Sequence, residues 1–182
     1  ALRRQCVQAL LALGAGAIGF GGWPIDAHGD LLAEMFERVT ALVPPTMPIF
    51  ALGVGKPEHL LTLSQHSRRY VFDCSLPTRD ARRHRLYAFV KGWQERLREP
   101  GARLYEYVYL LAEEHRRTKD PIDPSCDCLC CRNYSRAFLQ QLDRVKDSLG
   151  ERLQTIHNLR FYTRLIEALR AQSPAIDGGD SR

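Results

Sequence analysis

The chain has 182 residues, of which 45% are hydrophobic, and this length and composition fit one ordinary globular domain with a core. The formal net charge of +5 is a mild excess that permits a nucleic-acid partner without requiring one. No apolar run approaches the roughly 20 residues of a membrane span, and nothing at the N-terminus resembles a secretory signal, so we expect a cytoplasmic protein without a membrane partner.

Helix-like and strand-like segments alternate from residue 2 to residue 74. Apolar residues recur at helical spacing in 2–13 and in 31–43, and Pro57 stands where a third helix would begin. Each of these segments is followed by a short apolar run that is typical of a buried strand, at residues 17–21, 48–54 and 70–74. Alternating helices and strands with short connections predict parallel βαβ units, and therefore an α/β fold.

Each predicted strand ends in residues that suit a functional site. The first ends in glycines 21–22, the second leads into Gly53 and Gly55, and the third ends at Asp73. The carboxyl ends of parallel strands share one edge of a sheet, so the glycines would let a flat ligand approach the backbone beside Asp73, a candidate nucleophile or base. The alternatives are that the glycines only form turns and that Asp73 caps a turn or pairs with an arginine such as Arg79.

The segment 93–120 carries conflicting patterns. Residues 93–98 have a helical pattern, which residues 99–101 break. Alternating tyrosines in 104–111 favour a strand, whereas residues 112–117 favour a helix. The tyrosines either pack in a core or stack on RNA bases.

The last part of the chain is predicted to form two helices and a tail. Residues 134–149 and 151–170 carry apolar residues at helical spacing, and Gly150 is expected to separate the two helices. Residues 172–182 have no core-forming pattern, so we expect them to be disordered.

Four of the six cysteines lie between residues 126 and 131. A turn set up by the preceding prolines can bring Cys126, Cys128 and Cys131 around one point. Cys130 would then point away from it. A structural zinc site needs four ligands, and His157, on the predicted second helix, is the residue that could supply the fourth.

Other interpretations of this cluster remain open. Disulfides are an alternative, but cysteines one residue apart bridge badly, and free thiols beside a metal-type cluster indicate a reducing compartment. Cys130 could replace one of its neighbours as a ligand, and His157 could be an ordinary surface or core residue.

Four blocks of sequence stand in a fixed order: Gly21-Gly22 after a strand, then residues 52–57 (LGVGKP), 72–79 (FDCSLPTR) and 123–137 (DPSCDCLCCRNYSRA). In order and separation they resemble the C-terminal part of the tRNA-guanine transglycosylases. The resemblance covers nearly the whole chain and is weakest in 86–119.

The resemblance implies a (β/α)8 TIM-type barrel with a zinc-binding subdomain. A barrel of that class needs roughly 250 residues, so the 182 residues of this chain would be only its C-terminal portion. Residues 1–92 would be the last three βα units with the nucleophile, 93–120 an insertion or linker, 121–171 the zinc-binding subdomain with the terminal helices, and 172–182 a disordered tail. The family's other two essential aspartates would lie on missing strands, so we expect this chain alone to be inactive.

The resemblance also implies an activity. These enzymes exchange guanine at the wobble position of certain tRNAs for a 7-deazaguanine, on the route to queuosine or archaeosine. Asp73 would attack the ribose anomeric carbon as guanine leaves, and the new base would displace the covalent intermediate. Zinc, held by Cys126, Cys128, Cys131 and His157, would be structural.

Further roles follow from the resemblance, residue by residue. Gly22 and Trp23 stand where the family holds the base, although Trp23 departs from the family's leucine and leaves the choice of base open. Lys56, Arg79 and Arg82 match basic positions that meet the tRNA anticodon loop, where arginines can fork onto phosphate or stack on an unpaired base. A solvated run of charges is the alternative.

Two other functions stay open. One is a non-catalytic scaffold subunit of the same fold, against which the carboxylate of Asp73 argues. The other is a relative that places a deazaguanine in DNA, for which the altered loop at 23–26 and a longer spacing from Asp73 to Cys126 leave room. The partners that the family implies are tRNA, the guanine or 7-deazaguanine base, and a second subunit in a homo- or heterodimer.

Overall fold

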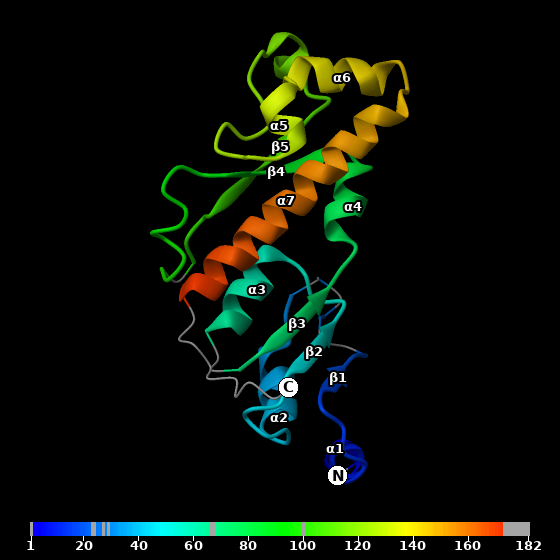
Figure 1. The fold of residues 1–182 in the computed structure, drawn as a ribbon, viewed down its shortest axis with the longest axis vertical. Helices are drawn as coiled ribbons and strands as arrows, with labels where there is room; N and C mark the ends of the chain where they lie inside the picture. The colour runs from blue at the N-terminus through cyan, green and yellow to red at the C-terminus, as the bar shows by residue number, and fades with distance from the viewer. Residues whose placement is uncertain are drawn as a thin grey trace, which may run out of the picture. The chain divides into compact units, whose positions relative to one another are not determined.

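The structure is a computed structural model that describes residues 2–22, 25–26, 28, 30–65, 68–99 and 101–172. The chain divides into two compact units, Ala1–Ser75 (unit 1) and Leu76–Arg182 (unit 2) (Figure 1). Trp23, predicted to hold the base, and residues 173–182 of the predicted disordered tail lie outside the described residues.

Unit 1 contains a three-stranded parallel sheet in the order β1-β2-β3. Its described elements alternate as predicted: α1 (Leu2–Ala12), β1 (Ile18–Phe20), α2 (Ala33–Thr40), β2 (Ile49–Leu52), α3 (Pro57–Ser64) and β3 (Tyr70–Asp73). The prediction of parallel βαβ units is therefore confirmed. The elements are shorter than the apolar runs that predicted them, because the flanking residues form turns.

The core of unit 1 lies between the sheet and its helices. Ile49 and Ala51 of β2 are fully buried, and the ring of Phe20 from β1 packs edge to face on Phe36 from α2 at a centroid distance of 4.9 Å. Alternate residues of each strand thus supply the apolar contacts. This packing holds the carboxyl ends of β1, β2 and β3 at one edge of the sheet.

Arg68 caps the carboxyl end of α2 and the turn that follows it. Its two terminal nitrogens donate hydrogen bonds to four backbone carbonyl oxygens, those of Thr40, Val43, Pro44 and Met47. The last carbonyls of a helix lack partners within the helix, so this single side chain satisfies groups that would otherwise depend on water.

Replacing Arg68 with glutamine is expected to destabilise unit 1 by about 2 kcal/mol, because hydrogen bonds from a charged donor stabilise by about 1.5–3 kcal/mol and glutamine cannot bridge the same carbonyls. Amide hydrogen exchange should become faster in β1, β2 and β3. The matched control is Arg69→Gln, since the neighbouring Arg69 is exposed. Equal exchange rates in the two variants would contradict the capping role.

Unit 2 is built around its longest helix, α7 (Ser148–Gln172), which packs against α4, β4, α5 and α6 (Figure 1). The other described elements are α4 (Leu76–Ala81), β4 (Arg85–Phe89), β5 (Tyr105–Tyr109), the 3-10 helix η1 (Glu113–Arg117), α5 (Leu129–Asn133) and α6 (Arg136–Arg144). Strands β4 and β5 form an antiparallel hairpin. The alternating tyrosines therefore belong to a strand.

Two helix predictions are wrong in unit 2. Residues 93–98 form turns, with Trp93 and Leu97 buried. Gly150 does not separate two helices, because it lies in the first turn of α7, and the chain instead turns at Lys146, which has a φ of 57°. A Cβ at position 150 would lie 2.7 Å from a carboxylate oxygen of Asp143, so the glycine allows close approach rather than a break.

Candidate metal centre and strand-end site

The metal centre predicted in unit 2 is assembled from one loop, one short helix and α7. Cys126 lies in the loop before α5, Cys128 is the N-cap of α5, Cys131 lies within α5, and His157 lies in α7. All four side chains are buried, and their ligand atoms lie within 4.8 Å of one another. Cys130 is fully buried among the apolar residues of the unit 2 core and is not part of this group.

The backbone of α5 brings two of the sulfurs together. The N–H of Cys131 donates to the sulfur of Cys128 at 3.3 Å, in the position where an N-cap side chain normally satisfies the first turn of a helix. Because the cap fixes Cys128 against Cys131, only Cys126 and His157 must be added by the rest of the fold. The local sequence therefore preorganises half of the site.

The donor set fits a zinc ion. Tetrahedral zinc with Zn–S bonds of about 2.3 Å places its sulfur ligands roughly 3.8 Å apart. Hydrogen bonds with Cys126 and Cys130 lower the pKa of Cys128, whereas hydrogen bonds with Cys126 and Cys128 raise the pKa of Cys131. One cysteine of the cluster therefore ionises readily, whereas ionisation of a second is opposed, because adjacent negative charges repel. A dication would remove this conflict and let all three ligands ionise.

The ring of His157 has a defined orientation. Its Nε2 lies 2.7 Å from the backbone oxygen of Tyr87, which can only accept, so Nε2 carries a proton and donates it. Its Nδ1 faces the sulfurs of Cys131 at 3.2 Å and Cys128 at 3.8 Å. Burial lowers the pKa of His157, but hydrogen bonds with Cys126 and Cys128 outweigh burial and raise the pKa to about 9. The bond to Tyr87 orients Nδ1 as the metal-binding atom.

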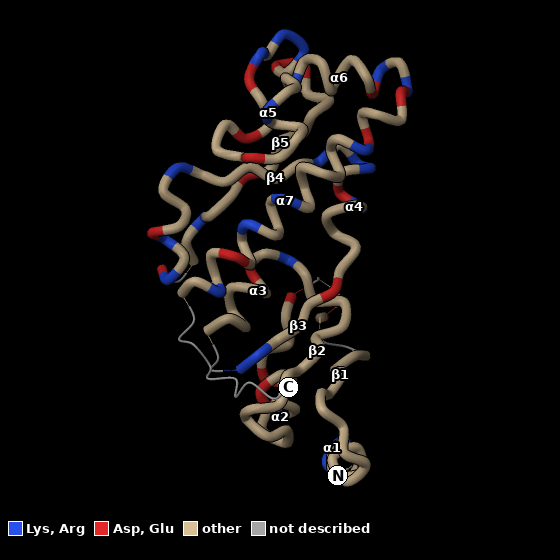
Figure 2. The backbone as a smooth tube through the Cα atoms, viewed as in Figure 1, with Lys and Arg blue, Asp and Glu red and all other residues tan. Residues whose placement is uncertain are grey.

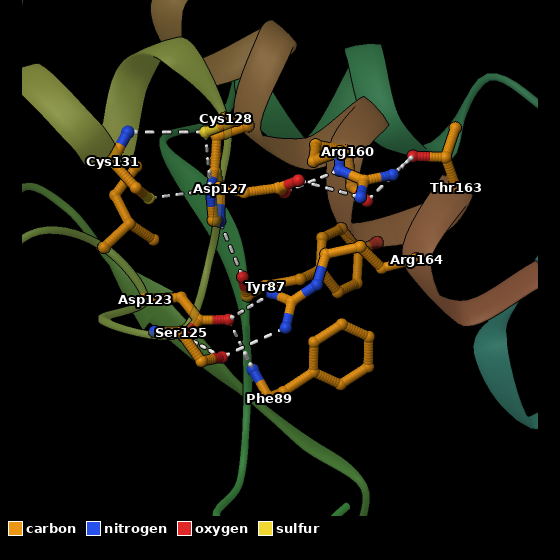
Figure 3. Close-up of polar contacts among 12 residues, drawn as sticks. Tyr87, Phe89, Asp123, Ser125, Asp127, Cys128, Cys131, Arg160, Thr163 and Arg164 are labelled. Carbon is orange, nitrogen blue, oxygen red and sulfur yellow. Dashed lines mark hydrogen bonds and ion pairs between the residues drawn. The ribbon is translucent and has the colours of Figure 1, made fainter. Parts of the chain in front are cut away.

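Carboxylates and arginines surround the loop that carries Cys126 and Cys128 (Figure 3). Asp127 accepts two hydrogen bonds from Arg160, at 2.7 and 3.0 Å. The bond from Arg160 lowers the pKa of Asp127. Sequence pattern alone singles out neither residue. Their positions in the sequence could have indicated this ion pair, because Asp127 stands between two predicted metal ligands and Arg160 lies one helical turn after His157.

A second candidate site lies at the strand ends of unit 1. Asp73, the last residue of β3, is exposed, and its Oδ1 accepts a hydrogen bond of 2.7 Å from the N–H of Gly53. Gly53 has a φ of 73° and Gly22 a φ of 99°, which only glycine adopts readily. Leu52 pairs in register with Asp73 and is 39% exposed, so an apolar surface lies beside the carboxylate.

Gly55 provides a close approach that the sequence alone did not reveal. A Cβ at position 55 would lie 2.0 Å from the sulfur of Cys74 and 2.2 Å from its Cβ. Glycine at 55 therefore lets the loop after β2 pack directly on the residue that follows Asp73. The close approach lies two residues from the hydrogen bond between the Gly53 N–H and Asp73.

The predicted RNA-binding residues have partly exposed side chains, each near an acidic partner. Lys56 in unit 1 lies 3.7 Å from Asp30, and in unit 2 Arg82 lies 3.1 Å from Glu151. Arg79 in unit 2 is half exposed and lies 3.9 Å from Asp80, whose side chain is fully buried. Figure 2 shows basic and acidic residues interspersed along unit 2 rather than separated. The exposed pairs of Lys56 and Arg82 are each worth about 0–1 kcal/mol, so they hold these two side chains only weakly.

None of the described helices combines the length and the apolar character that crossing a membrane requires.

Comparisons with known proteins identify the family that the four blocks of sequence resemble. The sequence model of a family described as queuine tRNA-ribosyltransferase matches residues 1–177. The queuine tRNA-ribosyltransferases of Psychrobacter sp. (strain PRwf-1) and Shewanella sp. (strain ANA-3) are each 37% identical to this chain over 171 residues. That of Aliivibrio salmonicida (strain LFI1238) is 36% identical over 171 residues. Each match covers 93% of this chain and 41% of the relative, so the chain spans about two fifths of these relatives.

Proposed function

Because this chain belongs to the queuine tRNA-ribosyltransferase family, we propose that it forms part of a tRNA-guanine transglycosylase, which replaces guanine at the tRNA wobble position by a 7-deazaguanine. Asp73 supports this function most directly. It presents an exposed carboxylate at the end of β3, and one of its oxygens accepts a hydrogen bond from the N–H of Gly53.

In the proposed reaction, an oxygen of Asp73 bonds to C1′ of the ribose while the C1′–N9 bond to guanine breaks. The electrons of that bond leave with guanine, which takes up a proton. The 7-deazaguanine then loses a proton and attacks C1′, and the bond from C1′ to Asp73 breaks and restores the carboxylate. A carboxylate suits both steps because it can capture and release an anomeric centre with oxocarbenium character.

Gly55 is expected to control this reaction through its contact with Cys74. A Gly55→Ala change puts a methyl group 2.0 Å from the Cys74 sulfur and must shift the backbone next to Asp73. We expect exchange to fall about 100-fold, because a misplacement of about 1 Å can cost that much. Adding Cys74→Gly, which removes the clashing atoms, should restore much of the rate.

The control for Gly55 is Gly16→Ala, because a Cβ at position 16 meets no atom within 4 Å. A Gly55→Ala variant that is as active as Gly16→Ala would contradict the role of the close approach.

The parallel sheet supports a place in a larger barrel. Within the described part of the chain, β1 and β3 each pair on one side only. Open edges of a parallel sheet can take further strands, and three strands cannot close a barrel. We therefore propose that β1, β2 and β3 belong to the last part of a (β/α)8 barrel and that residues 121–171 form a zinc-binding subdomain. The expected boundary between residues 1–92 and an insertion at 93–120 falls within the β4–β5 hairpin of unit 2. The 182 residues alone are expected to be inactive.

The metal would have a structural role. Cys126, Cys128, Cys131 and the Nδ1 of His157 would hold zinc, which supplies folding energy by joining the loop, α5 and α7. The base would lie near Gly22 and the exposed side chain of Leu52. The anticodon loop would meet Lys56, Arg79 and Arg82, and the active assembly would be a dimer.

The test is guanine exchange into unmodified tRNA, with radiolabelled guanine, by this chain joined to the barrel strands that its relatives supply. Label in tRNA that depends on Asp73 would support the proposal. Label in DNA and none in tRNA would overturn it in favour of a DNA-acting relative, and label in neither would favour a scaffold subunit. Exchange by the 182 residues alone would contradict the proposed need for further strands.

A further inference from the structure

We propose that Arg160 and Arg164 of α7 are positioning residues for the metal centre. They tie residues 123–128, here called the ligand loop, to the helix that carries His157, and so slow the release of the metal. This role rests on the proposed metal assignment. It concerns residues outside the Cys3His group, and it predicts that these residues, in addition to the four ligands, control the rate of metal release.

The Arg160 contact is a two-pronged ion pair. Its Nε and one terminal nitrogen donate to the two oxygens of Asp127 at 2.7 and 3.0 Å. The other terminal nitrogen donates to Glu167 at 2.8 Å and to Thr163 at 3.1 Å, so all three nitrogens of the guanidinium are engaged (Figure 3). The fork is therefore held in place before it meets the carboxylate, which is the arrangement in which arginine binds most firmly.

Asp127 transmits this hold to the metal ligands. It stands between Cys126 and Cys128 in the chain, and its side chain extends toward Arg160 (Figure 3). The sulfurs of both cysteines lie within 4.8 Å of the other ligand atoms. The ion pair thus restrains the backbone on both sides of Asp127. Opening the backbone at either cysteine would draw the Asp127 carboxylate away from Arg160.

Arg164 holds the other end of the ligand loop in a more shielded setting. It donates to Asp123 at 3.3 Å and to the hydroxyl of Ser125 at 3.2 Å, and its guanidinium lies over the ring of Phe89 at 5.1 Å. Asp123 is only 3% exposed and also accepts from the backbone N–H groups of Ser125 and Phe89. This end of the loop is therefore fastened to both α7 and β4.

The spacing along α7 allows His157, Arg160 and Arg164 to act on the metal centre together. Arg160 and Arg164 follow His157 by three and seven residues, so all three lie on one face of the helix. From that face His157 reaches the sulfurs, Arg160 reaches Asp127, and Arg164 reaches Asp123. Release of the metal requires the ligand loop to open, and opening must break these ion pairs first.

The experiment measures zinc release from the 182-residue chain, loaded with one equivalent of zinc and mixed with excess of a coloured chelator. Arg160→Gln is expected to speed release about tenfold, within the range of about 10–100-fold known for residues that support metal ligands. Asp127→Asn should match it, and the double variant should release zinc no faster than either. Arg160→Lys should recover part of the effect, because lysine keeps the charge without the fork.

One control and one graded variant separate the clamp from general effects. Arg152→Gln removes an exposed arginine of the same helix and should release zinc at nearly the wild-type rate. Glu167→Gln removes a contact that holds the Arg160 fork from outside the ligand loop, and it should speed release by less than Arg160→Gln does. Rising salt should speed release from the wild type but not from Arg160→Gln, since salt screens the exposed pair.

The absorption spectrum of the wild type with cobalt in place of zinc separates the proposed metal site from the proposed arginine clamp. Tetrahedral thiolate bands with no change of release rate in Arg160→Gln or Asp127→Asn would overturn the clamp and leave the metal site standing. Additive effects in the double variant would also overturn the clamp. No metal binding by the wild type would overturn the metal assignment and the clamp together.

Discussion

Replacing Asp73 with asparagine is expected to abolish guanine exchange, with a loss of roughly four orders of magnitude or more, as for removal of other enzymatic nucleophiles. Asparagine can still accept the hydrogen bond from Gly53, so the loop geometry persists while the attacking oxygen loses its negative charge. The measurement is incorporation of labelled guanine into tRNA by this chain joined to the remaining barrel strands.

Glu34→Gln is the matched control for Asp73, because Glu34 is an exposed carboxylate of unit 1 on α2. It should exchange guanine at the wild-type rate. An Asp73→Asn variant should also fail to form a covalent complex with tRNA. Exchange by Asp73→Asn at the rate of Glu34→Gln would exclude Asp73 as the nucleophile.

Replacing Cys131 with serine is expected to remove zinc from the chain and to unfold the region around the ligand loop. Structural zinc contributes about 10–16 kcal/mol in small zinc-binding peptides, so the loss of one thiolate should lower zinc affinity by at least about 100-fold. The measurements are zinc content per chain and amide exchange in α5 and the ligand loop. Both regions should lose protection together.

Cys130→Ser is the matched control, because Cys130 is adjacent to Cys131 and also buried but is not among the four grouped ligands. It should retain one zinc per chain, although burying a hydroxyl in place of the thiol costs about 1–3 kcal/mol. Loss of zinc in Cys130→Ser with retention in Cys131→Ser would reverse the assignment of the two cysteines. This comparison tests the alternative ligand that the spacing of the cysteines leaves open.

The two units differ in how well local patterns predict them. In unit 1, helical spacing and short apolar runs predict the order of the helices and strands, because each element buries a face whose period is visible in a short window. In unit 2, residues 93–98 have a helical pattern but form turns, since Trp93 and Leu97 are buried without a helix. Tertiary burial there overrides the local pattern.

Gly150 illustrates the same limit at a single residue. Glycine commonly ends helices, which favours a break at this position. The structure instead uses the absence of a side chain to bring the first turn of α7 close to Asp143 of α6. Glycine serves both purposes equally well, so the sequence cannot distinguish them.

The sequence by itself determined the α/β order of unit 1, the four candidate metal ligands and the carboxylate at the end of the third strand. These features depend on residue type and on spacing along the chain. Only the tertiary structure decided that Nδ1 of His157 faces the sulfurs, that Gly55 packs on Cys74, and that Arg160 forms an ion pair with Asp127. Each of these contacts joins residues on different elements, and their meeting depends on how the elements pack, which no local pattern encodes.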